Sequence, residues 1–157
     1  MRRLVACLAC TWGASLAAAA APAGDGWSGQ YGLQWVSVSQ AGSRLVLAKA
    51  PDADPGKLVE KYQSDLARWT LADVRTPTQT VSLRRFLAAE YEDLGWAALH
   101  AEGRIECLDA SRMFVCMTTP GTTVKIGRDG PRQESLLAST GVFGIVLHAG
   151  AFELKKE

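Results

Sequence analysis

The chain has 157 residues, with 17 Lys and Arg, 16 Asp and Glu, and 2 His, which gives a formal net charge of +1. This length fits a single domain rather than several. No dense basic block accompanies the nearly neutral charge, so we expect no nucleic-acid partner, because nucleic-acid binding needs a concentrated positive face.

Residues 1–23 have the pattern of a secretory signal peptide. A positive start, "MRR", precedes the apolar run at 4–20, and Ala21 and Ala23 match the small-x-small rule for cleavage. We expect cleavage after Ala23 or Ala20, a retained anchor being the alternative. The sequence therefore predicts a single domain over 24–157, a periplasmic or secreted location, and no integral membrane span after cleavage.

The first pattern of this domain predicts a β-hairpin over residues 31–50. Its turn is expected at Ala41–Gly42, between two segments that alternate in polarity. Pairing across that turn places Val36 opposite Leu47 and Val38 opposite Leu45. These four side chains would form one apolar face, which a slip of one residue would turn to solvent.

Two mid-chain segments show helical periodicity. Asp54 is a good N-cap for a helix over 54–69, with Pro55 at its first position. A second helix is expected over 82–94, and Gly95 can end it. The apolar stripes recur at three- and four-residue spacing: Leu58, Tyr62, Leu66 and Trp69 in the first helix, and Leu83, Phe86, Leu87, Tyr91 and Leu94 in the second.

The rest of the chain reads as strands. Residues 96–101 either continue the second helix or form a strand, and we favour the strand. Residues 122–126 are predicted as a strand followed by a "GRDGP" turn. A final hairpin over 141–156 would turn at Ala149–Gly150, with Leu147 opposite Phe152. Strands, two helices and strands again predict an α+β fold: an antiparallel sheet of β-hairpins with two mid-chain helices packed on one face.

Cys107 and Cys116 are the two cysteines that remain after signal cleavage. A turn at Ser111–Arg112 places them opposite each other at a non-hydrogen-bonded pair, where the Cα separation is about 4.5 Å. That distance is within reach of a disulfide. Eight intervening residues disfavour a redox pair, and a zinc site would need more ligands. We therefore predict a cross-strand structural disulfide.

No group of residues predicts catalysis, a metal site or a cofactor. Ser139 lacks the G-x-S-x-G elbow of serine hydrolases. His100 and His148 are isolated, and each is interpreted as structural. The charged residues of the second helix are interpreted as a solvated face with scattered ion pairs: Arg84, Arg85, Glu90, Glu92 and Asp93.

The sequence therefore favours binding over catalysis. We expect an exported, non-enzymatic binding protein, such as an inhibitor, immunity-type or accessory protein of the cell envelope, with another protein as its partner. Trp27, Trp35 and Trp96 are the candidate binding residues, because exposed aromatic side chains are enriched at interfaces. One alternative is a small-molecule or lipid carrier with a pocket between sheet and helices. Another is a hydrolase using His148 or His100.

Overall fold

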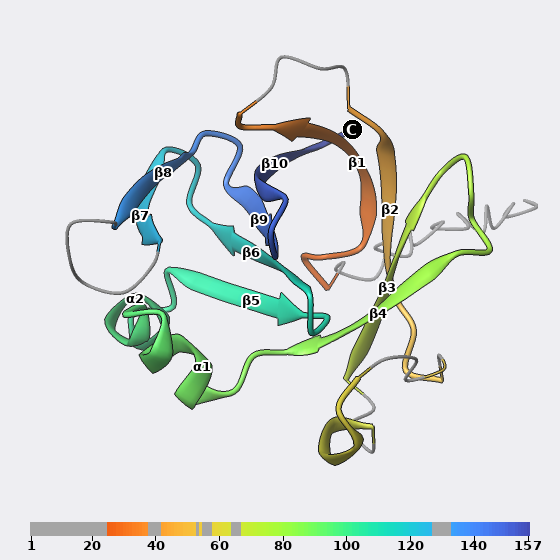
Figure 1. The fold of residues 1–157 in the computed structure, drawn as a ribbon, viewed down its shortest axis with the longest axis horizontal. Helices are drawn as coiled ribbons and strands as arrows, with labels where there is room; N and C mark the ends of the chain where they lie inside the picture. The colour runs from red at the N-terminus through yellow and green to blue at the C-terminus, as the bar shows by residue number, and fades with distance from the viewer. Residues whose placement is uncertain (1–24, 38–41, 53, 55–57, 64–66, 127–132) are drawn as a thin grey trace, which may run out of the picture.

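The computed structural model describes residues 25–37, 42–52, 54, 58–63, 67–126 and 133–157. The main element is a closed barrel of antiparallel strands (Figure 1). Strands that follow each other along the chain are neighbours in the barrel, except that β9 pairs with β6, and β10 closes the barrel against β1. The barrel strands are β1 (Gly29–Trp35), β2 (Arg44–Lys49), β3 (Arg68–Asp73), β4 (Thr80–Arg85), β5 (Ile105–Asp109), β6 (Met113–Thr118), β9 (Val142–Val146) and β10 (Gly150–Lys156).

Three smaller features are attached to this barrel. A 3-10 turn, η1 (Glu60–Tyr62), lies between β2 and β3, and two short helices, α1 (Ala88–Asp93) and α2 (Ala97–Ala101), lie between β4 and β5. Strands β7 (Thr122–Ile126) and β8 (Glu134–Ala138) form a separate two-stranded sheet. Figure 1 shows the two helices and this hairpin on the same side of the barrel.

The predicted α+β fold is wrong, because the protein is mainly β and its sheet closes into a barrel. The segments predicted as helices supply two of the barrel strands. Trp69 and Leu71 alternate with polar residues along β3, as do Val81 and Leu83 along β4. A barrel strand needs an apolar residue at every second position, and this period of two decides the structure here.

The predicted secondary structure needs correction at three places. Where a helix was expected over 54–69, the described residues contain the 3-10 turn η1 and then the start of β3. Pro55 and Leu66 lie outside the described residues. The helix over 82–94 is β4 up to Arg85, and it becomes helical at Ala88. Residues 96–101, predicted as a strand, contain α2.

Both outer hairpins exist, but their predicted registers are wrong. Leu47 pairs with Gly29 rather than Val36, because a long connection replaces the expected tight turn. Val38 and the "GRDGP" turn lie outside the described residues. In the last hairpin Phe152 pairs with Gly144 instead of Leu147, since the turn occupies residues 147–149 rather than Ala149–Gly150. The strand predicted over 122–126 is confirmed as β7.

Large apolar side chains fill the barrel interior. An eight-stranded barrel is just wide enough either to be filled by side chains or to hold one small ligand. Packing here is close: a Cβ at Gly144 would lie 2.2 Å from the ring of Phe152, so the strand needs glycine there. The buried members of this inner core are Trp27, Tyr31, Leu45, Leu47, Trp69, Leu71, Leu83, Leu108, Ala110, Val115, Val142, Phe152 and Leu154.

A second core lies on the outer face of the barrel wall. It contains the Cys107–Cys116 disulfide, with a Cα separation of 4.1 Å, so both the predicted bond and its register are confirmed. Alternation along β5 and β6 turns Leu108 and Val115 inward and the two cysteines outward. The buried members are Tyr91, Trp96, Ile105, Cys107, Cys116, Val124, Leu136, Ala138 and Phe143, which come from the helices, the β7–β8 hairpin and the barrel wall.

Asp25 fastens the start of the described chain to the barrel. Its carboxylate accepts hydrogen bonds from the Trp69 indole Nε1–H at 2.7 Å and from the backbone N–H of Ser28 at 2.7 Å. Tyr31 donates its hydroxyl to the carbonyl of Trp27 at 2.7 Å. These bonds hold the buried Trp27 ring against the interior of the barrel.

The signal peptide predicted over residues 1–23 lies outside the described residues. Within the described part of the chain, no helix is long and apolar enough to cross a membrane.

Removing the disulfide with the double variant C107A/C116A should lower the free energy of unfolding by about 2–3 kcal/mol, because the bond closes a loop in the unfolded chain. Urea denaturation of the oxidised wild type, the reduced wild type and the variant measures this difference. The reduced wild type and the variant should lose similar amounts. Two free thiols in the oxidised protein would contradict the assignment.

Replacing Asp25 by Asn should lower the free energy of unfolding by about 1–3 kcal/mol at neutral pH, because both carboxylate oxygens accept hydrogen bonds and Asn offers one acceptor oxygen, so either the Trp69 indole or the Ser28 backbone N–H is left unpaired. Burial opposes ionisation of Asp25, but the Ser28 N–H and the Trp69 indole lower its pKa below the ordinary 3.8. The wild type should therefore lose stability as pH falls through and below that value, and D25N should lose less. The surface variant D93N is the control, and an identical acid profile for D25N and wild type would contradict this role.

Candidate functional site

The barrel wall is weakest between β4 and β5. These strands pair through Arg84–Asp109 and Arg85–Leu108, whereas β3 and β4 pair along five positions. Above Arg84, toward its first residue, β4 runs away from β5 (Figure 1). The splayed end belongs to the barrel mouth, where β1, β3, β5 and β9 end and β2, β4, β6 and β10 begin.

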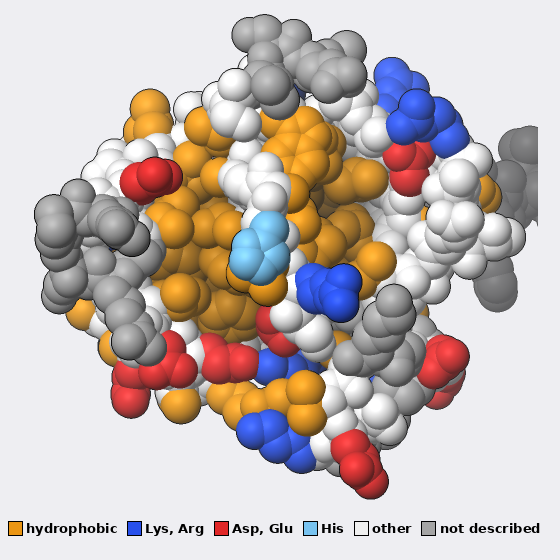
Figure 2. Space-filling view, viewed as in Figure 1, with side chains coloured by type: hydrophobic (Ala, Val, Ile, Leu, Met, Phe, Trp, Pro, Cys, Tyr) orange, Lys and Arg blue, Asp and Glu red, His pale blue; other side chains and the backbone are white. Residues whose placement is uncertain are grey.

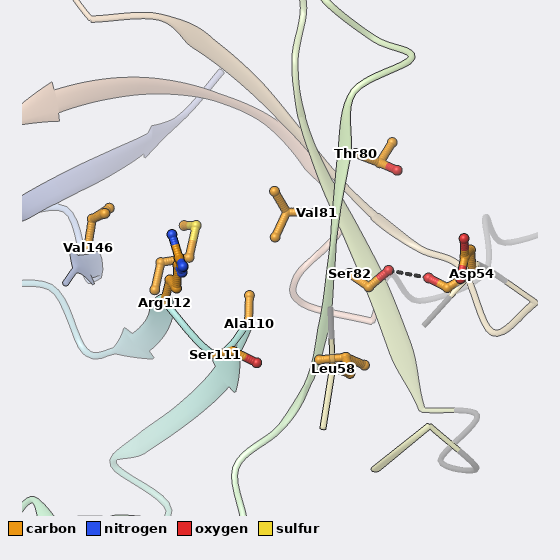
Figure 3. Close-up of a pocket in the computed structure, with 10 residues that line it drawn as sticks. Asp54, Leu58, Thr80, Val81, Ser82, Ala110, Ser111, Arg112 and Val146 are labelled. Atoms are coloured by element: carbon orange, nitrogen blue, oxygen red, sulfur yellow. Dashed lines mark hydrogen bonds between the residues drawn. The ribbon is translucent and has the colours of Figure 1, made fainter. Parts of the chain in front are cut away.

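A cleft of about 660 Å³ opens at this gap (Figure 3). Its size lies within the range of pockets that bind small molecules, roughly 300–1,000 Å³. One side is formed by β4 and the β2–β3 connection, and the other by the β5–β6 turn and the end of β9. The lining residues are Asp54, Leu58, Thr80, Val81, Ser82, Ala110, Ser111, Arg112, Met113 and Val146.

The floor of the cleft is apolar. Val81 pairs with Leu71 of β3, and Met113 pairs with Val146, so these side chains continue the inward-facing rows of the barrel. Met113 and Val146 pack against the inner core. A molecule in the cleft would therefore rest on the core without entering the filled barrel.

Several exposed aliphatic side chains surround the mouth. Figure 2 shows hydrophobic side chains gathered in a hollow on this face. Val81 lines the cleft and is 41% exposed. Val36, Val74 and Leu147 directly follow β1, β3 and β9 and are exposed by 56%, 44% and 59%. We call Val36, Val74 and Leu147 the mouth rim, and Val81 belongs to the cleft floor.

A buried arginine closes the wall just below the cleft. Arg84 is 3% exposed, and its guanidinium contacts Glu90 at 2.5 Å and Asp109 at 3.0 Å. Its Cζ lies 3.7 Å from the centre of the Tyr62 ring. It also donates to the carbonyl of Arg85 at 2.8 Å. This cluster joins β4, β5, α1 and η1.

The charges in this cluster shift one another's pKa. Burial opposes the charge of Arg84, but the hydrogen bond to Glu90 raises its pKa. Burial likewise opposes ionisation of Glu90, yet Arg84 and the Leu87 N–H lower its pKa. Burial raises the pKa of Asp109, although Arg84 and the Ser111 N–H oppose that rise. The cluster therefore contains one cation, Arg84, and two carboxylates whose pKa values shift in opposite directions: that of Glu90 is lowered and that of Asp109 is raised.

The β5–β6 turn continues from this cluster into the cleft. The carboxylate of Asp109 accepts a hydrogen bond from the Ser111 backbone. Ala110 donates to the carbonyl of Met113 at 2.9 Å. The predicted turn at Ser111–Arg112 is confirmed, and it places Arg112 at the edge of the cleft.

The tryptophans chosen from the sequence do not line the cleft. Trp27 belongs to the inner core and Trp96 to the outer core, and each is 1% exposed. The indole of Trp96 donates to the carbonyl of Lys125 at 2.7 Å. Trp35 is partly buried and contacts Phe152 edge-on, with ring centres 5.6 Å apart.

Neither histidine lines the cleft, and the two belong to different parts of the fold. His100 is in α2, and its ring stacks on Tyr91 with centres 3.8 Å apart. Its Nδ1 is 3.2 Å from the carbonyl oxygen of Ile105. His148 lies in the exposed β9–β10 turn. They do not form the shared site that the hydrolase hypothesis requires. Among the described residues, no three His, Cys, Asp or Glu side chains gather as a possible metal site.

The cleft residues had little signal in the sequence. Val81 precedes the helix predicted over 82–94, and Val146 falls within the hairpin predicted over 141–156. Arg112 is predicted only as a turn residue of the cysteine hairpin. It comes to the cleft only because β4 splays away from β5.

No protein-family model matches the chain, and neither the curated proteins nor the solved structures contain a significant match.

Replacing Arg84 by Met should lower the free energy of unfolding by about 3–5 kcal/mol at neutral pH, because two partly buried carboxylates lose their cation. The matched control is R85Q, which removes an exposed partner of Glu106 at 3.5 Å and should lose less than about 1 kcal/mol. The R84M defect should shrink as pH falls, since protonation neutralises the uncompensated carboxylates. Equal, small losses of stability in both variants would contradict the proposal that Arg84 holds β4 and β5 together.

Proposed function

We propose that this chain is an exported binding protein that carries one small apolar or amphipathic molecule at the barrel mouth. The cleft carries the proposal: about 660 Å³, an apolar floor, and a few polar groups at its edges. Small-molecule sites typically combine an apolar lining with a small number of polar groups that orient the ligand. The pocket differs in place from the one expected between sheet and helices.

The electrostatics of the cleft support binding rather than chemistry. The described lining contains one carboxylate, Asp54, and one guanidinium, Arg112, on opposite sides. Catalysis by an acid and a base would need titratable groups that converge on a reacting atom. The remaining lining is aliphatic, hydroxyl-bearing or backbone.

Export is part of the same proposal. The signal pattern at residues 1–23 supports it, as does the Cys107–Cys116 disulfide, because disulfides persist in oxidising compartments. Native mass spectrometry of the protein from the exported fraction, without reduction, tests both parts. A mature mass starting near residue 24 with a bound small molecule would support the proposal, and a retained N-terminus would contradict export.

The mouth rim favours a second candidate, the binding of another protein. Exposed aliphatic residues gathered in one place often mark an interaction surface. An inhibitor or accessory role for the cell envelope would use this surface. The same mass-spectrometry experiment separates the candidates, because a second protein in the complex favours the rim and a small bound mass favours the cleft.

Placing a charge in the cleft should weaken the binding of an apolar ligand. V81D should weaken binding of the neutral fluorescent probe N-phenylnaphthylamine by about tenfold or more, because the apolar floor would then hold a carboxylate. Fluorescence titration of purified protein measures this affinity. The matched control is L137D, at a residue on β8 that is 55% exposed and outside the cleft lining, and it should bind like wild type. Equal affinity for both variants would contradict the site.

A further inference from the structure

Arg112 differs from the other arginines at the mouth. Arg44 pairs with Glu157 at 3.2 Å, and Arg75 pairs with Asp73 at 3.0 Å. Arg112 lines the cleft, yet it has no ion pair with any residue that the structure describes. A cation at the edge of an apolar cleft, with no counter-ion among the described residues, is suited to an anionic group on a ligand.

The backbone of Arg112 is held from both sides. Its N–H donates to the carbonyl of Ala110 at 2.7 Å, and its own carbonyl accepts from Leu147 at 2.8 Å. The second bond links the β5–β6 turn to the β9–β10 turn. Below them, Asp109 accepts from Ser111 and is itself held by Arg84 at 3.0 Å. Fixing the base of a long side chain in advance reduces the entropy lost on binding.

These two linked turns also carry backbone strain. Ser111 has φ 66° and His148 has φ 64°, and they are the two non-glycine residues with positive φ among the described residues. This conformation is unfavourable for a residue with a Cβ, and strained residues cluster at ligand clamps. Glycine would relieve the strain at either position, so both turns adopt a geometry that local preference alone does not favour.

The surroundings of Arg112 define the rest of the ligand. Val81, Met113 and Val146 give the cleft an apolar floor that suits a hydrocarbon chain. Arg112 supplies a planar fork of N–H donors, which matches the two oxygens of a carboxylate. Asp54 lies across the cleft, on the side formed by the β2–β3 connection, and would repel an anion placed there. The anionic end is therefore directed to the Arg112 side.

We propose that the cleft binds a single-chain amphipathic carboxylate, with its chain on the apolar floor and its head group on Arg112. This inference rests on the proposed carrier function, and it names the class of molecule carried. Arg112 acts as a specificity-determining residue: it selects a charged head group over a neutral one of the same chain length.

A competition experiment tests head-group selection. Decanoate and decanol have the same chain, and each would be used to displace N-phenylnaphthylamine from the protein at neutral pH. The wild type should prefer decanoate by about tenfold, which corresponds to one charge-assisted hydrogen-bonding pair at a partly exposed site. R112Q should reduce that preference to about one, chiefly through a loss of decanoate affinity. R112K, which keeps the charge but loses the fork, should retain part of the preference.

The matched control is R104Q, which removes an exposed arginine that pairs with Glu102 at 3.1 Å and does not line the cleft. It should keep the wild-type preference. If the wild type binds both compounds equally, the head-group inference is overturned while the carrier function stands. A preference that survives in R112Q also overturns the role of Arg112. If the probe and both compounds fail to bind, the proposed function falls together with this inference.

Discussion

The ion-pair cluster around Arg84 is the interaction on which the shape of this barrel depends. β4 and β5 share two paired positions, and one of them is Arg84–Asp109. A wall joined by so few backbone bonds needs side chains to hold it, and Arg84 does so from a buried position against Glu90 and Tyr62. The cluster holds β4 against β5 below the cleft, whereas the part of β4 before Arg84 does not pair with β5.

The two hydrophobic cores explain why the opening lies where it does. The inner core occupies the barrel interior with large apolar side chains. The outer core packs the helices and the β7–β8 hairpin against β5, β6 and β9, with the disulfide among them. That layer covers the outer wall near the start of β5. The described residues form no such layer over the splayed strands at the mouth end, where Val81, Met113 and Val146 line the cleft.

Stability and function meet in the β5–β6 turn. Asp109 takes part in the Arg84 cluster and also accepts a hydrogen bond from Ser111, one residue before Arg112. Buried ion pairs contribute little net stability but impose a defined geometry where they are retained. In this protein that geometry extends from the Arg84 cluster, where β4 meets β5, to Arg112 at the edge of the cleft. The strain at Ser111 is held in place by the same contacts.

Local patterns in the sequence determined the features that depend on neighbours along the chain. The turn at Ser111–Arg112 sets the register of its own hairpin, so the pairing of Cys107 with Cys116 could be predicted. The outer hairpins could be predicted to exist, but their registers could not, because their turns are longer or displaced. Short apolar segments fit both a helical and a strand period, which led to the wrong assignment of β3 and β4.

Tertiary structure alone decided the rest. Closure of β10 against β1 joins the two ends of the domain, and no local pattern reports a contact of such sequence separation. Burial of Trp27 and Trp96 follows from that closure and from the outer layer, whereas tryptophan in a sequence fits core and surface equally well. The cleft exists because two strands diverge above one buried arginine, and divergence is a property of the assembled sheet. The sequence by itself determined the Cys107–Cys116 disulfide and the turn beside it. Only the folded barrel could bring Arg112 to the apolar floor of the cleft.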